Sequence, residues 1–130
     1  METALDLEFV PRAAVVRTAR DATAVVVSSL SPARQDDVRL LVSEIVTNSV
    51  RHGGRGSDRW IRLRVACGDG RVRVEVRSGG SAIAFERSAK EGSLRESGWG
   101  MYLLENLADR WGASSGEDGT CVWFEVDRAR

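Results

Sequence analysis

The sequence of 130 residues has zero formal net charge, two cysteines and no long hydrophobic run. Without a net charge, the chain has no overall field that would draw it to nucleic acid or to an acidic membrane. Its hydrophobic runs stay well short of the roughly 20 residues that a membrane-spanning helix needs. The first residues, METALD, lack the basic start of a secretory signal. We therefore expect a cytoplasmic protein that binds neither a membrane nor nucleic acid directly.

The two cysteines, Cys67 and Cys121, lie in separate strand-like runs without metal-ligand residues beside them. A disulfide and a zinc site are the alternatives to free thiols in such a chain. Free cysteine packs as a small apolar residue. The sequence therefore predicts two buried free thiols.

One amphipathic segment, residues 38–53, carries polar side chains at the edge of its apolar face. The apolar face consists of Val38, Leu41, Val42, Ile45 and Val46. Glu44, Asn48 and His52 are spaced by four, so they lie along one edge of that face. A carboxylate one turn from a carboxamide can order a water and offer an oxygen to Mg²⁺, the cation that accompanies nucleotide phosphates. The same spacing also occurs on solvated helix faces, so by itself it favours a structural role.

Hydrophobic periodicity predicts an alternation of helices and paired strands along the chain. The expected elements are a short strand at 8–10, helices at 12–30 and 32–53, strands at 60–67 and 71–77, an irregular segment at 84–98, a helix at 101–110, and strands at 111–114 and 120–126. A glycine-containing connection at 68–70 joins two alternating strands, as in an antiparallel hairpin. No internal repeat or linker interrupts this order. It predicts one domain, an α/β (α+β) two-layer sandwich with helices on one face of a mostly antiparallel mixed sheet.

Arginines gather in one part of the chain, with few acidic residues among them. They are Arg51, Arg55, Arg59, Arg62, Arg64, Arg71, Arg73 and Arg77. A solvated sheet face accounts for this distribution. The alternative is a surface for an acidic protein, rather than for nucleic acid, because no aromatic stacking pattern or recognition helix accompanies the arginines. Under that alternative, Arg62, Arg64 and Arg73 are the partner-binding residues.

A glycine pair, Gly98 and Gly100, stands immediately before the helix that begins near Met101. Glycines at a helix start expose backbone N–H groups to an anion, and the helix dipole adds partial positive charge there. Alone, this pattern is more typical of a tight turn. Its interpretation as an anion-binding helix start depends on the other motifs of the chain.

Three segments together resemble the GHKL (Bergerat-fold) ATPase superfamily, which includes histidine kinase-like ATPase domains. Residues 41–53 (LVSEIVTNSVRHG) are similar to its first box, residues 98–112 (GWGMYLLENLADRWG) to its glycine box and helix, and residues 122–126 (VWFEV) to its last strand. More narrowly, the chain resembles the actinobacterial-type anti-sigma-factor serine kinases, the switch-protein kinases of stress and sporulation regulation. The resemblance runs from about residue 9 to residue 126.

The resemblance implies a role for each matching residue. Glu44 would be the general base that polarises a serine hydroxyl of a partner protein. Asn48 would hold the Mg²⁺ that bridges the phosphates of ATP, and residues 84–97 would form a lid. The other residues expected near the nucleotide are Arg51, His52, Ser78, Gly80, Gly98, Gly100 and Met101.

The chain departs from this family at the box that holds adenine. The family's Asp-x-Gly-x-Gly box uses its aspartate to accept a hydrogen bond from the adenine amino group, whereas residues 78–82 here read SGGSA. Ser78 thus replaces the aspartate and Ala82 replaces the last glycine. A hydrogen bond to a charged acceptor contributes about 1.5–3 kcal/mol, so its loss would weaken nucleotide binding roughly ten- to a hundredfold. Ala82 adds a Cβ where the backbone must approach the ligand closely.

Two main functions are consistent with these residues, and a sensor domain that has lost any sigma partner is a third alternative. The first is an anti-sigma factor that binds an alternative sigma factor, is released by an anti-anti-sigma (STAS-type) partner, and has weakened or lost nucleotide binding and kinase activity. The second is a Mg·ATP-dependent serine/threonine kinase that phosphorylates the anti-anti-sigma factor and so adds negative charge to it. Ser78 and Ala82 favour the first function, and Glu44 and Asn48 favour the second. The resemblance also implies a homodimer.

Overall fold

The structure, a computed structural model of the chain, describes residues 1–52, 59–79, 100–116 and 119–128. The strands within these ranges are β1 (Glu2–Phe9), β2 (Ile61–Gly68), β3 (Arg71–Ser78), β4 (Arg110–Gly116) and β5 (Gly119–Asp127). The helices are α1 (Ala13–Val26), α2 (Pro32–His52) and α5 (Gly100–Leu107). None of these helices is both long and apolar enough to cross a membrane.

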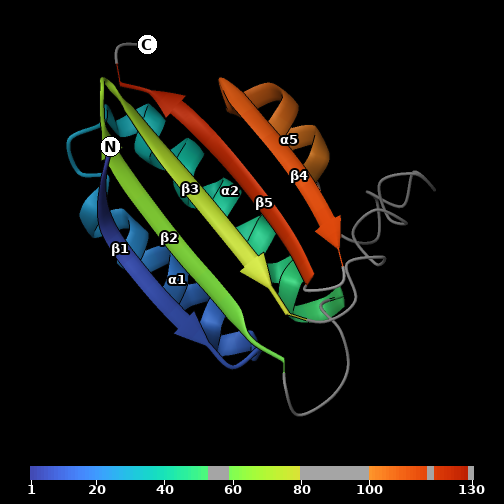
Figure 1. Cartoon of the computed structure of the whole chain (residues 1–130). Coiled ribbons are helices and arrows are strands. Elements are labelled where there is room, and N and C mark those ends of the chain that lie inside the picture. The colour runs from blue at the N-terminus through green and yellow to red at the C-terminus, as the bar shows by residue number, and fades with distance from the viewer. Residues whose placement is uncertain (53–58, 80–99, 117–118, 129–130) are drawn as a thin grey trace.

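The strands form one sheet in the order β1-β2-β3-β5-β4, and the three helices cover one of its faces (Figure 1). The sequence predicted a mostly antiparallel mixed sheet. Every pairing between the described strands is antiparallel. The predicted two-layer α+β sandwich is confirmed, with its other sheet face uncovered by any described helix.

Three boundaries differ from the prediction by three residues or more. β1 begins at Glu2 rather than near residue 8, because it pairs with β2 along its whole length. Pairing with a strand that lies far along the chain leaves little signal in the N-terminal residues themselves. α1 ends at Val26, inside a run of valines that disfavours helix. α5 ends at Leu107, since the chain enters β4 at Arg110.

The core lies between α2 and the covered face of the sheet. The five predicted apolar residues of α2 are each at most 1% exposed. From the sheet they meet inward-facing residues of three strands, which include Ile61, Leu63, Val65, Val72, Val74, Val76 and Phe124. Burial of a side chain of this size stabilises the fold by about 1.5–3 kcal/mol. The rotation of α2 about its own axis is therefore fixed by the sheet.

The two cysteines are free, as predicted, but both are half-buried rather than buried. The Cys67 thiol lies 3.8 Å from the carbonyl oxygen of Val26. The Cys121 thiol is 3.8 Å from a carboxylate oxygen of Glu75 on the uncovered face of the sheet. Partial burial raises the pKa of both thiols.

Two glycines shape the ends of the hairpins. Asp69 and Gly70 have φ values of 54° and 73°, so positive values occupy both central positions of the β2–β3 turn, as in a type I′ turn. Gly119, at the start of β5, has a φ of 125°, and a Cβ built there would overlap the carbonyl oxygen of Ser78. β5 therefore begins directly against the end of β3.

Replacing Gly119 by alanine should destabilise the protein more than replacing Gly70. Both positions have positive φ, so each alanine substitution lowers the stability by roughly 1–2 kcal/mol through backbone strain. At Gly70 nothing lies within 4 Å of the new Cβ, whereas at Gly119 the backbone of Ser78 must also move. Urea unfolding measures both losses, and equal losses would show that the two strands have room to separate.

Candidate functional site

The polar edge predicted for α2 lies beside the buried face of that helix. Asn48 is 8% exposed, and Glu44, one turn earlier, is half-buried. The Asn48 Oδ1 atom is buried and accepts no hydrogen bond within the described part of the chain. A buried acceptor without a donor costs about 1–3 kcal/mol. This oxygen is therefore suited to a ligand that supplies a donor or a cation.

Mg²⁺ fits this oxygen in type, since it takes oxygen ligands and commonly binds through one or two protein groups together with substrate phosphates. A metal site made of protein ligands alone needs several such side chains close together. The described residues contain no group of three or more His, Cys, Asp or Glu side chains that could hold a metal. A single amide oxygen such as that of Asn48 suits a cation that is also held by a phosphate ligand.

The end of β3 meets α2 through two serines. Ser78 is 7% exposed, and its hydroxyl donates a hydrogen bond of 2.9 Å to Ser49 Oγ. Ser49 in turn donates to the carbonyl oxygen of Ile45 at 3.1 Å. The box position at which the sequence departs from the family that it resembles therefore contacts the residue that follows Asn48.

Ser49 and Trp60 are two residues of this site that sequence reasoning missed. Ser49 interrupts the apolar face of α2 one turn after Ile45, and a polar residue in that stripe was the available signal. Trp60 accepts a hydrogen bond of 3.0 Å from the Gly79 backbone N–H through its carbonyl oxygen. A Cβ at Gly79 would overlap the Trp60 indole, so glycine lets this ring lie against the end of β3.

α5 begins at Gly100, one residue before the predicted start at Met101, and runs antiparallel to α2 (Figure 1). Leu104 is fully buried, and Met101 is half-buried. Because of this direction, the Gly100 end of α5 points toward the half of α2 that carries Asn48. The end of β3 lies toward the same end of the molecule. The structure thus brings three of the predicted segments toward one region.

The structure describes only some of the remaining predicted site residues. Arg51 is exposed in the last turn of α2, and His52 is its final residue. Gly80, Gly98 and the predicted lid at 84–97 lie outside the described residues.

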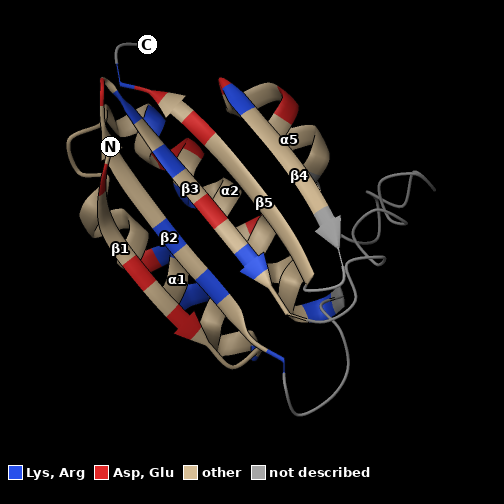
Figure 2. Cartoon of the chain, in the orientation of Figure 1, with Lys and Arg blue, Asp and Glu red and all other residues tan. Residues whose placement is uncertain are grey.

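The uncovered sheet face carries Arg62, Arg64 and Arg73, the three predicted partner-binding residues, and each lies near a carboxylate of the same face. Arg62 donates two hydrogen bonds of 2.8 Å to Asp6, and Arg64 lies 3.6 Å from the same carboxylate. Arg73 binds Glu125 at 3.3 Å and covers the Trp123 ring at 4.2 Å. Basic and acidic residues alternate over this face (Figure 2). The face is therefore a mixed-charge surface rather than an unopposed basic one.

Glu125 is the most heavily paired carboxylate on that face. It is 7% exposed and accepts hydrogen bonds from Arg110 at 2.7 Å, Arg73 at 3.3 Å and Arg71 at 3.5 Å. Burial alone would raise the pKa of Glu125, but the hydrogen bonds from Arg110 and Arg73 outweigh it and lower the pKa below 4.5. The folded state therefore favours the ionised carboxylate.

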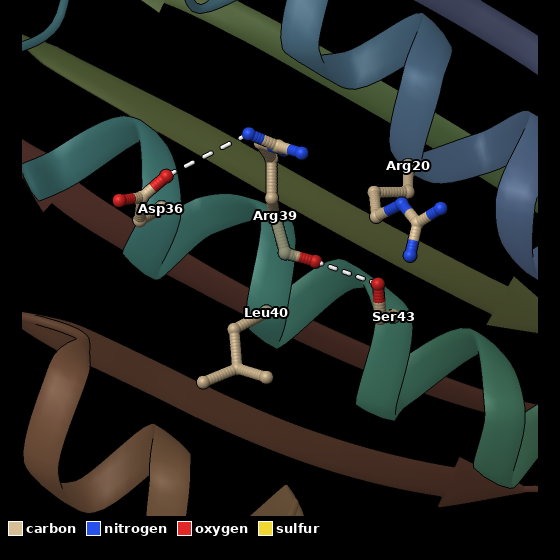
Figure 3. Close-up of a pocket in the computed structure, with 5 residues that line it drawn as sticks. All are labelled: Arg20, Asp36, Arg39, Leu40 and Ser43. Carbon is tan, nitrogen blue, oxygen red and sulfur yellow. Dashed lines mark hydrogen bonds and ion pairs between the residues drawn. The ribbon is translucent and has the colours of Figure 1, made fainter. Parts of the chain in front are cut away.

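A shallow hollow of about 260 Å³ lies between α1 and α2, on the side that faces away from the sheet (Figure 3). Its lining residues are Arg20, Asp36, Arg39, Leu40 and Ser43. Ser43 donates to the carbonyl oxygen of Arg39 at 2.8 Å, and Arg39 lies 3.6 Å from Asp36. The hollow includes none of the residues predicted to bind a nucleotide.

Comparison with known proteins finds one matching family and several similar anti-sigma F factors. A family described as the histidine kinase-like ATPase domain matches residues 9–126. The anti-sigma F factor of Clostridium botulinum (strain Eklund 17B / Type B) is 32% identical over 117 residues, covering 83% of this chain and 82% of that protein. The anti-sigma F factor of Geobacillus thermodenitrificans (strain NG80-2) is 30% identical, with 100% of this chain and 96% of that protein covered.

One solved structure is also similar, the histidine kinase domain from Erythrobacter litoralis EL346 blue-light activated histidine kinase. Its TM-score is 0.59 at 28% sequence identity. The match covers 74% of this chain and 45% of that chain, so the present chain spans less than half of the kinase structure. It spans most of the length of the two anti-sigma F factors.

The lowered pKa of Glu125 makes one part of the stability depend on pH. Because the folded pKa lies below 4.5, the stabilisation is complete above that pH and is lost as the pH falls through the folded value. Glu125→Gln should therefore lower the free energy of unfolding at pH 7, and the gap to the natural protein should narrow below about pH 4.5. Urea unfolding measures this gap. The exposed Glu105→Gln serves as control, and a gap for Glu125→Gln that stays constant down to pH 3 contradicts the ion-pair account.

Proposed function

The chain belongs to the histidine kinase-like ATPase family, and we propose that it is an anti-sigma factor in which Ser78 weakens nucleotide binding. It would bind an alternative sigma factor and release it when an anti-anti-sigma (STAS-type) protein competes. The similarity to two anti-sigma F factors over most of their length supports this function. The observation that carries the nucleotide part is the hydrogen bond from Ser78 to Ser49.

That hydrogen bond limits what position 78 can offer a nucleotide base. The hydroxyl hydrogen of Ser78 is directed to Ser49, which leaves only neutral oxygen lone pairs as acceptors. A hydrogen bond to a charged acceptor is worth about 1.5–3 kcal/mol, and a neutral acceptor contributes roughly 0.5–1.5 kcal/mol. Adenine would therefore be held more weakly here than by an aspartate.

The phosphate side of the proposed site retains its polar groups. Asn48 would hold Mg²⁺ together with nucleotide phosphates, and its buried Oδ1 without a donor among the described residues supports this role. When bound, Mg²⁺ supplies positive charge against the phosphates. The backbone N–H groups that begin α5 at Gly100, and Met101 beside them, would face the same phosphates. Arg51, His52, Gly80, Gly98 and the lid remain predictions.

A second candidate function follows from the same α2 edge. Glu44 lies one turn from Asn48, where it would accept the proton of a partner's serine hydroxyl in a Mg·ATP-dependent serine/threonine kinase. The buried Asn48 oxygen favours this candidate over complete loss of nucleotide. Micromolar binding of Mg·ATP by the natural chain would favour the kinase. Weaker binding would favour the anti-sigma factor that acts mainly by holding its partner.

Ser78→Asp should strengthen Mg·ATP binding about ten- to a hundredfold, because a carboxylate at the end of β3 restores a charged acceptor. Ser49 is placed to donate to the new carboxylate, since it already contacts Ser78 at 2.9 Å. Isothermal titration of the natural and altered proteins with ATP and ADP, with Mg²⁺ present, measures the change.

Two controls make that titration specific. Ser43→Asp adds the same charge to α2 on the side that faces away from the sheet, and it should leave the affinity unchanged. Ser78→Ala removes the hydroxyl without adding charge, and it should bind no more tightly than the natural chain. If the Ser78→Asp variant binds ATP no more tightly than the Ser43→Asp variant, the role given to Ser78 is refuted.

For the partner surface, we propose that Arg62, Arg64 and Arg73 face an acidic region of the sigma factor. Changing all three to glutamate would also leave Asp6 and Glu125 without these partners, so the face would become strongly acidic. Association should then slow markedly at low salt, with a smaller change in final affinity, because surface charge acts mainly on the encounter rate. Stopped-flow measurement of complex formation at several salt concentrations tests this.

The matched control changes Arg12, Arg17 and Arg39 to glutamate. These arginines are exposed on the helical side of the molecule, and the change in net charge is the same. If the two triple variants associate at equal rates, net charge rather than the sheet face sets the encounter, and the proposed surface is wrong.

A further inference from the structure

The first turn of α2 buries an arginine that connects it to α5. Arg34 is 6% exposed. Its Nη1 donates to Asp37 at 3.0 Å and to the carbonyl oxygen of Leu107 at 3.2 Å, and its Nη2 donates to Asp109 at 2.5 Å. The guanidinium therefore joins the beginning of α2 to the last residue of α5.

Asp109 extends this connection to the sheet. The same carboxylate oxygen that binds Arg34 also accepts the backbone N–H of Asp127 at 2.7 Å. The backbone N–H of Asp109 donates to the carbonyl oxygen of Glu125 at 2.9 Å. The carboxylate side chain is 11% exposed, so the ion pair is largely shielded from water. We call Arg34, Asp109 and the Leu107 carbonyl the clamp.

The clamp holds one end of a short helix whose other end faces the proposed phosphate site. α5 has eight residues, and a helix of that length is marginal in isolation, so its position depends on what holds it. With its C-terminal end fixed at the start of α2, the Gly100 end lies about 10 Å farther along, at a rise of about 1.5 Å per residue. That displacement runs toward Asn48, because α5 is antiparallel to α2.

Arg34 and Asn48 also lie on nearly the same edge of α2, about four helical turns apart. The contact of Arg34 with Leu107 shows that this edge faces α5. A shift of α5 along α2 therefore changes directly how near its first N–H groups come to Asn48. The clamp is the set of charged contacts that fixes this shift.

We propose that Arg34 and Asp109 are positioning residues for nucleotide phosphates. They set how far the N-terminal amides of α5 reach toward Asn48, although neither residue would touch the nucleotide. This inference rests on the proposed function, because it concerns the phosphate part of the same site. Loosening the clamp should weaken binding of the triphosphate and leave contacts to the base unchanged.

The test compares Asp109→Asn with Asp36→Asn. The first keeps an acceptor for the Asp127 N–H but removes the charge that holds Arg34. The second makes the same chemical change at an exposed position near the start of α2. Each is made in the natural chain and with Ser78→Asp. Affinities for Mg·ATP and for adenosine are measured by titration, and backbone hydrogen exchange is followed in α1, β2 and α5.

Asp109→Asn should weaken Mg·ATP binding roughly tenfold, as expected for displaced helix N-terminal charge, and change adenosine binding less than twofold. Amides of α5 should exchange faster, while those of α1 and β2 keep their protection. Asp36→Asn should change none of these. If Asp109→Asn lowers adenosine and ATP binding equally, or leaves ATP binding at the Asp36→Asn value, the inference is overturned and the proposed function stands.

One further variant and one further outcome complete the test. Arg34→Lys retains a charge beside Asp109 but cannot span both that carboxylate and the Leu107 carbonyl as the guanidinium does. It should reproduce the same pattern, so it replaces Asp109→Asn if that variant does not fold. If neither the natural chain nor Ser78→Asp binds ATP, nucleotide use by this chain is refuted, and the positioning role is refuted with it.

Discussion

Packing of α2 against the sheet is the constraint on which the rest of this structure depends. Its five apolar residues are nearly inaccessible to water, and each contributes about 1.5–3 kcal/mol of hydrophobic stabilisation, so the helix cannot rotate without exposing them. That fixed rotation directs Ser49 to the end of β3, and it directs Arg34 to the end of α5. Asn48 directly precedes Ser49 and lies on nearly the same edge of α2 as Arg34.

This placement gives the proposed nucleotide site two sides of different chemistry. On the phosphate side, Asn48 has a buried oxygen without a donor among the described residues, which suits a cation and its phosphates. On the base side, Ser78 is a neutral hydroxyl already bonded to Ser49. Under the proposed function, the chain would keep the family's fold and a metal-type ligand while its recognition of the base is weaker. Such a chain can still act by binding a protein partner.

Sequence patterns predicted the features that depend on neighbours along the chain. The apolar face of α2, the β2–β3 hairpin and the start of α5 to within one residue all follow from local periodicity or from glycine placement. Contacts between distant residues could not be predicted in this way. The Ser78–Ser49 hydrogen bond and the Arg34–Asp109 ion pair join segments separated by 29 and 75 positions. Likewise, the sequence showed the arginines of the sheet face but not the carboxylates that pair with them.

In the proposed function, this protein holds a sigma factor with little dependence on nucleotide. The most direct measurement is titration of the protein with purified alternative sigma factors, with and without saturating Mg·ATP. A ligand shifts a binding equilibrium only by its differential affinity for the two states. We expect a complex whose dissociation constant changes less than about tenfold, or 1.4 kcal/mol, when Mg·ATP is added. Absence of any complex, or a complex that forms only with Mg·ATP, would contradict it.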